Sequence, residues 1–340
     1  MSQPKILVIG SNSFSGSHFV AEALSAGHEV WGVSRSTEPD PVFLPYRWPV
    51  EKVGQALATT ENFHFQPIDL NKQLVDLLEL IDKVQPELVV NFAAQGMVAE
   101  SWLNPTHWYR TNVVAQVALH DALRQKSFLQ KYVHVTTPEV YGSTDGGWIK
   151  EHNHFTPSTP YAVSRAACDM HLQSFHEAYG FPVVFTRAAN VYGPGQQLYR
   201  IIPRALLSAR TGKPMQLHGG GHSVRSFVHI KDVVKGTLKL ALDGTPGTTW
   251  HISTQKSCSI RELVQRICKI TSIDFEELVH QAVDRLGKDQ SYLLDSSAIR
   301  QVHDWSEEIT LERGIQETLE WVDANLAKLK KLPWEYQHKT

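Results

Sequence analysis

The chain has 340 residues and a mass of 38.3 kDa, which is enough for two average domains or one large α/β domain with a second lobe. Lys and Arg number 33 against 35 Asp and Glu, a formal charge of −2, and no basic block could cover bulk nucleic acid. Apolar runs such as residues 88–94 are far shorter than the roughly 20 residues of a membrane span, and the N-terminus lacks a signal-peptide pattern. Composition thus excludes a disordered or fibrous chain, and we expect a cytoplasmic protein without nucleic-acid or membrane partners.

Strand and helix patterns alternate from the N-terminus onward. Residues 5–10 form a β-branched apolar run that ends in glycine, and a helix-spaced apolar pattern and a second strand over 28–33 complete a βαβ unit. The alternation continues with strands at 63–68, 87–93, 131–137 and 182–189 and with helices at 72–83, 106–126 and 161–179. Such alternation predicts an α/β protein with a Rossmann-type, doubly wound parallel sheet.

A glycine-containing turn joins the first strand to the first helix. Gly10, Ser13 and Gly16 occupy the positions of a G-x-x-G-x-x-G turn, where glycine lets a pyrophosphate approach the amides of the helix N-terminus. The serine weakens the match, and such a pattern alone can be purely structural. Its place directly after the first strand of a βαβ unit favours a dinucleotide site that includes Phe14 and Ser15.

The second strand ends without the carboxylate that would hold the adenosine ribose of NAD(H). It reads Ser34-Arg35-Ser36, and this combination favours the 2′-phosphate of NADP(H), with NAD(H) and a merely solvated arginine as the alternatives. Asp69 and Leu70 follow the third strand. A carboxylate there could meet the adenine amino group, although Asp69 could equally cap a helix beginning near Leu70.

Tyr161 and Arg165 lie four residues apart at the start of the predicted helix over 161–179, so both side chains project from one helical face. A cation at that position favours tyrosinate and brings the phenol toward a useful pKa. Tyr161 could therefore act as the general base that removes a hydroxyl proton during hydride transfer.

Several segments, in this order and spacing, resemble the extended short-chain dehydrogenase/reductases, in particular the nucleotide-sugar dehydratases, epimerases and decarboxylases. The resemblance covers nearly the whole chain, and it implies a nicotinamide cofactor and a nucleotide-diphosphate sugar as substrate. The segments are GSNSFSG (10–16), NFAAQ (91–95), TTPEVYG (136–142), PYAVSRAACD (160–169), NVYGPG (190–195), RIIP (200–203), RSFVHIKDVV (225–234) and GKDQSYLLDSS (287–297).

The resemblance also implies roles for individual residues. Tyr161 would deprotonate the sugar 4-hydroxyl while C4 passes its hydride to the nicotinamide. Arg165 stands where the family has a lysine that contacts the nicotinamide ribose, so the positive charge is kept in a larger, planar head. Ala93 and Gln95 would line the nicotinamide side of the cofactor.

Residues 136–139 bear on which reaction follows the oxidation. By resemblance, Thr136 or Thr137 hydrogen-bonds the sugar O4 and Glu139 takes the C5 proton, whereas Pro138 replaces the aspartic acid that protonates the departing 6-hydroxyl in 4,6-dehydratases. The leading prediction is a dehydratase that makes a 4-keto-6-deoxy sugar. An epimerase or C4 dehydrogenase working through the 4-keto sugar is the alternative, and a non-catalytic binding protein is a third, less favoured reading.

Glycine and proline punctuation from residue 190 predicts a second, smaller lobe of mixed α/β structure. We assign residues 1–189 to an NADP(H)-binding Rossmann domain, with a return segment at about 226–250, and residues 190–340 mainly to a nucleotide-sugar lobe. The resemblance places four residues against the diphosphate or the nucleoside: Asn190, Arg200, Arg225 and Arg285.

Histidine and cysteine spacing predicts no metal site. None of the 17 histidines pairs with another at a helical ligand spacing beside an acid, and the 3 cysteines form neither a disulfide framework nor a ligand pair. The resemblance further implies a homodimer, because the helices of relatives that correspond to 106–126 and 161–179 pack between subunits.

Overall fold

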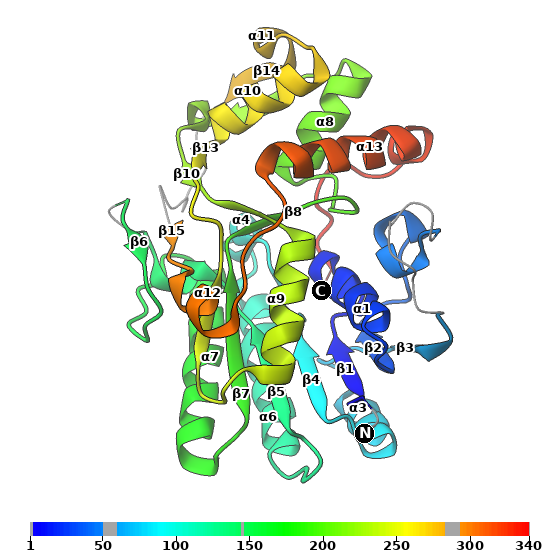
Figure 1. The fold of residues 1–340 in the computed structure, drawn as a ribbon, viewed down its shortest axis with the longest axis vertical. Coiled ribbons are helices and arrows are strands. Elements are labelled where there is room, and N and C mark those ends of the chain that lie inside the picture. The colour runs from blue at the N-terminus through cyan, green and yellow to red at the C-terminus, as the bar shows by residue number, and fades with distance from the viewer. Residues whose placement is uncertain (1–2, 50–59, 144–145, 283–292, 340) are drawn as a thin grey trace.

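The computed structural model describes residues 3–49, 60–143, 146–282 and 293–339, and a parallel seven-stranded sheet lies at its centre (Figure 1). Neighbouring strands follow the order β12-β7-β5-β4-β1-β2-β3. The strands are β1 (Ile6–Ile9), β2 (Val30–Ser34), β3 (Phe63–Pro67), β4 (Leu88–Asn91), β5 (Lys131–Val135), β7 (Val183–Ala188) and β12 (Thr249–Ile252). This order confirms the predicted doubly wound, Rossmann-type sheet.

Helices cover both faces of the sheet, which is why strands such as β1 and β4 are apolar and buried throughout their length. One face packs against α1 (Phe14–Ser25) and α9 (Ile230–Asp243), and the other against α3 (Leu74–Val84), α6 (Ala115–Leu123) and α7 (Pro160–Tyr179). None of the helices in the described ranges combines the length and apolarity needed to cross a bilayer.

The predicted helix over 106–126 is interrupted. It consists of α5 (Pro105–Tyr109), a π-helical turn η4 (Arg110–Val114) and α6. Other short elements of this half are α4 (Val98–Ser101), α12 (Ser297–His303), and the 3-10 turns η1 (Pro41–Phe43), η2 (Pro45–Arg47), η3 (Thr60–Asn62) and η5 (Pro138–Tyr141).

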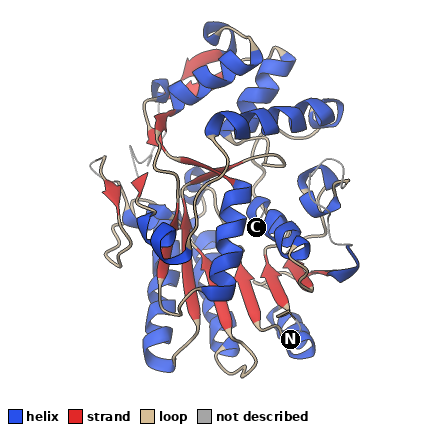
Figure 2. Ribbon diagram, in the orientation of Figure 1, coloured by secondary structure: helices blue, strands red, loops and turns tan. Residues whose placement is uncertain are grey.

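The second lobe combines helices with short strands (Figure 2), and it has its own apolar core. Its helices are α8 (Ile201–Thr211), α10 (Ile260–Thr271), α11 (Phe275–Leu278) and α13 (Leu311–Leu329), with a 3-10 turn η6 (Gly219–Gly221) and a parallel pair of β9 (Met215–His218) and β14 (Val279–Ala282). Three further strand pairs complete the fold: β8 (Asn190–Tyr192) with β11 (Phe227–His229), β10 (Val224–Arg225) with β13 (Cys258–Ser259), and β6 (Trp148–Ile149) with β15 (Leu293–Leu294).

The carboxyl ends of the parallel strands meet at one edge of the sheet, which faces the second lobe (Figure 1). The loops after β1 to β5 therefore gather at that edge, and this is where open α/β sheets bind ligands.

Candidate active site

Two glycines make the turn after β1 possible. Gly10 has a φ of +85°, and a Cβ on it would lie 2.8 Å from the backbone nitrogen of Ala93, after β4. A Cβ on Gly16 would lie 2.2 Å from the carbonyl oxygen of Gly10. The turn thus needs glycine for its backbone conformation at one end and for helix–strand packing at the other.

Ser13 stands at the middle glycine position of the G-x-x-G-x-x-G turn, and its side chain caps the N-terminus of α1. Its hydroxyl accepts a hydrogen bond from the amide of Gly16 at 3.0 Å. The amides of Phe14 and Ser15 are the first two of the helix and have no acceptor within it. Together with the positive end of the helix dipole, these amides fit the pyrophosphate of a dinucleotide.

The loop after β2 is held against the glycine turn by Asn12, a residue that the sequence did not single out. The backbone N–H of Asn12 donates to the Ser34 hydroxyl at 2.9 Å, and the Asn12 side-chain Nδ2 donates to the carbonyl of Ser36 at 3.0 Å. Ser34 and Ser36 therefore fix the loop that carries Arg35.

Residues after α13 reach this loop from the far end of the chain. The carbonyl oxygen of Lys339 accepts hydrogen bonds from Arg35 Nη1 at 3.0 Å and from Gln95 Nε2 at 2.9 Å. The ring of His338 stacks on Trp108, with centroids 5.1 Å apart and planes 6° apart. Arg35, predicted to hold the 2′-phosphate, and Gln95, predicted to line the nicotinamide side, thus donate to the same acceptor.

Asp69 and Gln95 line one cavity of about 200 Å³. The alternative in which Asp69 caps a helix beginning near Leu70 is wrong, because α3 begins only at Leu74. Asp69 Oδ1 instead accepts from the Asn71 amide at 2.9 Å, which makes an Asx turn, and the Leu70 side chain is buried. The remaining residues around the cavity are Asn71, Lys72, His107, Arg110 and Thr111.

Asn112 was also missed from the sequence. It lies in the π-helical turn, and its side chain exchanges two hydrogen bonds with the backbone of Gln95, at 2.8 and 3.1 Å, while donating a third to Ser164 Oγ at 3.0 Å. Asn112 therefore ties the loop after β4 to α7. A π-turn often marks such a site, but no simple sequence pattern announces one.

Tyr161 lies in the first turn of α7, next to the end of β5. It shares a hydrogen bond with the Thr137 hydroxyl, and Glu139 and Arg200 also act on its charge. Burial and then the Glu139 carboxylate raise the pKa of Tyr161, while Arg165, Thr137 and Arg200 oppose the shift. The expected effect of Arg165 is present, but burial outweighs it, so Tyr161 carries its proton at neutral pH.

Pro138 opens the short helix η5, a position that suits proline because the first amide of a helix needs no partner. Thr137 caps this helix by accepting from the Glu139 amide at 3.3 Å. The turn therefore holds Thr137 and Glu139 in one rigid unit beside Tyr161.

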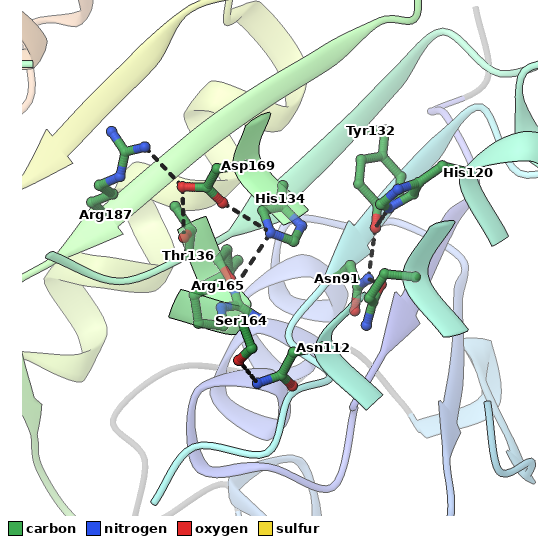
Figure 3. Close-up of polar contacts among 12 residues, drawn as sticks. Asn91, Asn112, His120, Tyr132, His134, Thr136, Ser164, Arg165, Asp169 and Arg187 are labelled. Carbon is green, nitrogen blue, oxygen red and sulfur yellow. Dashed lines mark hydrogen bonds and ion pairs between the residues drawn. The ribbon is translucent and has the colours of Figure 1, made fainter. Parts of the chain in front are cut away.

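Arg165 is buried, with 2% of its surface exposed, and its contacts lead into the protein (Figure 3). Arg165 Nη2 donates to the carbonyl of Val135 and lies 3.5 Å from His134 Nε2. His134 Nε2 lies 3.3 Å from Asp169 Oδ1, and Asp169 Oδ2 accepts from Arg187 Nη2 at 2.8 Å. The guanidinium thus belongs to a buried charged network under the site.

The side chains of His120, His134 and Cys168 bring nitrogen and sulfur atoms within 4.8 Å of one another, a grouping that spacing did not reveal. Burial raises the pKa of Cys168 to about 12, and Arg165 lies close enough to act on both His134 and Cys168. A protonated thiol beside a buried guanidinium suits a neutral core cluster better than a cation site. The absence of a metal stays a prediction.

Three of the four residues predicted to contact the diphosphate or the nucleoside lie in the described part of the chain, and two of these are neighbours, because the Asn190 backbone amide donates to the carbonyl of Ser226, next to Arg225, at 3.0 Å. Asn190 begins β8, and Arg200 lies at the start of α8 within electrostatic reach of Tyr161. Arg225 faces a different cavity of about 420 Å³, also lined by Lys256 and Arg266. Arg285 lies outside the described residues.

These features define a class of protein. An extended short-chain dehydrogenase/reductase combines four such features: this parallel sheet, a glycine turn at a helix N-terminus, a tyrosine and a cation four residues apart on α7, and a Thr/Glu turn beside them. Residues 7–318 match the family described as GDP-mannose 4,6 dehydratase, and the chain belongs to that family.

Individual relatives extend over most of the chain. It is 32% identical over 338 residues to a dTDP-glucose 4,6-dehydratase of Streptomyces antibioticus, covering 96% of each protein. It is 31% identical over 268 residues to the trifunctional UDP-glucose 4,6-dehydratase/UDP-4-keto-6-deoxy-D-glucose 3,5-epimerase/UDP-4-keto-L-rhamnose-reductase of Arabidopsis thaliana, covering 78% of this chain but 40% of that protein. The crystal structure of DesIV, a dTDP-glucose 4,6-dehydratase from Streptomyces venezuelae with NAD bound, superposes with a TM-score of 0.84 at 28% identity, over 95% of this chain and 98% of that one.

Proposed function

We propose that the protein is a nucleotide-sugar 4,6-dehydratase, which converts a nucleotide-diphosphate sugar to its 4-keto-6-deoxy form. The main observation behind this proposal is that Tyr161, Thr137 and Glu139 lie together at the carboxyl end of β5. These groups supply a base for the 4-hydroxyl, a hydrogen-bond partner for O4 and a carboxylate for C5. Relatives named as 4,6-dehydratases support the assignment.

Side chains of this protein transfer the protons in the proposed reaction. A bound nicotinamide dinucleotide supplies the oxidation at C4 and later the reduction. In its ionised form, Tyr161 takes the 4-hydroxyl proton, with Thr137 holding the oxygen, and the resulting 4-ketone acidifies the C5 proton. Glu139 takes that proton. The C5–H and C6–O bonds break, the C5–C6 double bond forms, and protonated Glu139 returns the proton to the departing hydroxyl as water, a role that Pro138 cannot fill. Reduction at C6 and uptake of a solvent proton at C5 then give the 4-keto-6-deoxy sugar.

The decisive experiment incubates the protein and dinucleotide with a panel of nucleotide-sugars in deuterated water and identifies the products by mass spectrometry. Loss of water with deuterium incorporated is expected. Deuterium without water loss would instead indicate C5 epimerisation, the alternative that Pro138 keeps open, and an unlabelled diastereomer would indicate C4 epimerisation. A non-catalytic binding protein would convert none of the sugars.

NADP(H) is the dinucleotide we propose, because β2 ends at Ser34 and is followed by Arg35 and Ser36, without a carboxylate. NAD is the alternative, since it is the cofactor named for DesIV. Arg35→Ala should therefore weaken NADP(H) roughly tenfold or more, and NAD(H) much less, in a fluorescence titration of each dinucleotide. Equal weakening of both would contradict a contact with the 2′-phosphate.

We also propose a homodimer, built on the face shared by η4 and α7. Large apolar side chains are exposed on both elements, including Val114 at 63% and Met170 at 52%. Met170→Asp should raise the fraction of monomer in sedimentation velocity, whereas Val302→Asp, at a site 65% exposed on α12, should not. A monomeric unsubstituted protein would contradict the proposal. The cytoplasmic location and the absence of nucleic-acid partners stay predictions.

A further inference from the structure

A buried histidine stands between a buried cation and a buried carboxylate. Arg165 and Asp169 lie four residues apart on α7, a spacing at which opposite charges on a helix normally pair. His134 of β5 comes between them, with Nε2 3.5 Å from Arg165 Nη2 and 3.3 Å from Asp169 Oδ1 (Figure 3). The exposed fractions of the three residues are 2%, 0% and 1% for Arg165, Asp169 and His134.

The protonation of His134 follows from its surroundings. Burial lowers its pKa, so the ring is neutral and one nitrogen carries the hydrogen. Placed on Nε2, that hydrogen points at the carboxylate. Placed on Nδ1, it would set the Nε2 lone pair against Asp169 and leave a buried N–H without an acceptor, because Nδ1 has no hydrogen-bond partner within the described residues. The Nε2–H form is therefore favoured.

Asp169 does not need Arg165 as a partner. Its Oδ2 accepts from Thr136 Oγ1 at 3.0 Å and from Arg187 Nη2 at 2.8 Å, and His134 faces its Oδ1. Burial alone would raise the pKa of Asp169, but Arg187, His134 and then Arg165 hold it below the usual value. The carboxylate is thus ionised, its Oδ2 is hydrogen-bonded by Thr136 and Arg187, and Arg165 acts on it through space and not through a direct ion pair.

We propose that His134 is a positioning residue that keeps Arg165 and Asp169 from closing into a direct ion pair, so that the charge of Arg165 remains available to Tyr161. An ion pair is a dipole, whose field falls off faster than that of a single charge. The charged groups that act on Tyr161 are Glu139, Arg165 and Arg200. The groups around Arg165 are His134, Asp169, Tyr132 and Cys168. This inference rests on the proposed function, in which Tyr161 takes the proton.

His134→Ala tests the proposal, because it removes the ring that separates Arg165 from Asp169 and lets the two close into an ion pair. The pH midpoint of Tyr161 ionisation should rise by about one unit, and the pH profile of turnover should move with it at little change in KM. His134→Gln keeps a side chain of similar length with an N–H for Asp169, so it should retain the midpoint of the unsubstituted protein. His120→Ala is the matched control, since His120 is equally buried but bonds Tyr132 at 2.9 Å.

Ionisation of Tyr161 is read from tyrosinate absorbance, as the difference between each protein and its Tyr161→Phe counterpart, and this readout needs no turnover. An unchanged midpoint in His134→Ala, or an equal shift in His120→Ala, would overturn the positioning role. If the unsubstituted protein converts no sugar, the proposed function fails, while the absorbance titration still decides about His134. His134→Ser, which also removes the ring, takes the place of His134→Ala if circular dichroism shows that the latter does not fold.

Discussion

Tyr161→Phe is expected to lower turnover of the nucleotide-sugar by about 10²–10⁴-fold, which is the usual contribution of a positioned general base. The substitution removes only the hydroxyl that shares a hydrogen bond with Thr137. The helix start and the glycine turn stay intact, so dinucleotide affinity should change little. Steady-state kinetics and a dinucleotide titration on the same preparation measure the two effects.

Tyr179→Phe provides the control, because Tyr179 closes the same helix and is 60% exposed. It should leave turnover unchanged. Because the pKa of Tyr161 is raised, turnover of the unsubstituted protein should increase as the pH rises from neutral. Near-normal turnover of Tyr161→Phe would remove this residue from the role of base.

Asp169→Asn is expected to lower the free energy of unfolding by about 3–5 kcal/mol, because it leaves the buried Arg187 guanidinium without its carboxylate. Denaturant unfolding followed by circular dichroism measures the loss. Asp323→Asn is the comparison, since its ion pair with Arg210 is partly exposed, and it should cost no more than about 1 kcal/mol. A similar cost for the two variants would contradict the importance of the buried network.

The effect of Asp169→Asn should also depend on pH. The pKa of Asp169 is lower in the folded protein than its ordinary value of 3.8. Its stabilising contribution is therefore fully present above pH 3.8 and is lost as the pH falls through the lower, folded value. Acid unfolding should be less steep in Asp169→Asn, whereas an identical acid transition would show that Asp169 does not titrate in this way.

Local sequence patterns were enough to predict the parallel sheet and many residues of the candidate site. The β-branched runs and the helical spacing mark the sheet strands β1, β2, β3, β4, β5 and β7, because most residues of these strands are buried between helix layers. Gly10, Ser13 and Gly16 lie at a turn whose backbone demands them. These features depend on residues close in sequence, so they can be recognised from the sequence alone.

Contacts between distant residues were not predictable in the same way. Asn112 joins Gln95 to Ser164 from within a π-turn, and His134 enters the space between Arg165 and Asp169 from a neighbouring strand. No spacing encodes such meetings, because they depend on how β5, α6 and α7 pack. The same holds for Lys339, which meets Arg35 across 304 positions of sequence.

That last contact links the proposed cofactor site to the second lobe. A ligand that takes the Arg35 and Gln95 hydrogens now bonded to the Lys339 carbonyl must first release that carbonyl, so its apparent affinity contains the free energy of detaching the segment. The same segment is anchored on α8, where Arg204 donates to the Trp334 carbonyl at 2.9 Å and to Glu335 at 2.7 Å. Thermodynamic coupling is reciprocal. If a second ligand strengthens or loosens this anchor and so changes the affinity for the dinucleotide, then the dinucleotide changes the affinity for that second ligand by the same factor.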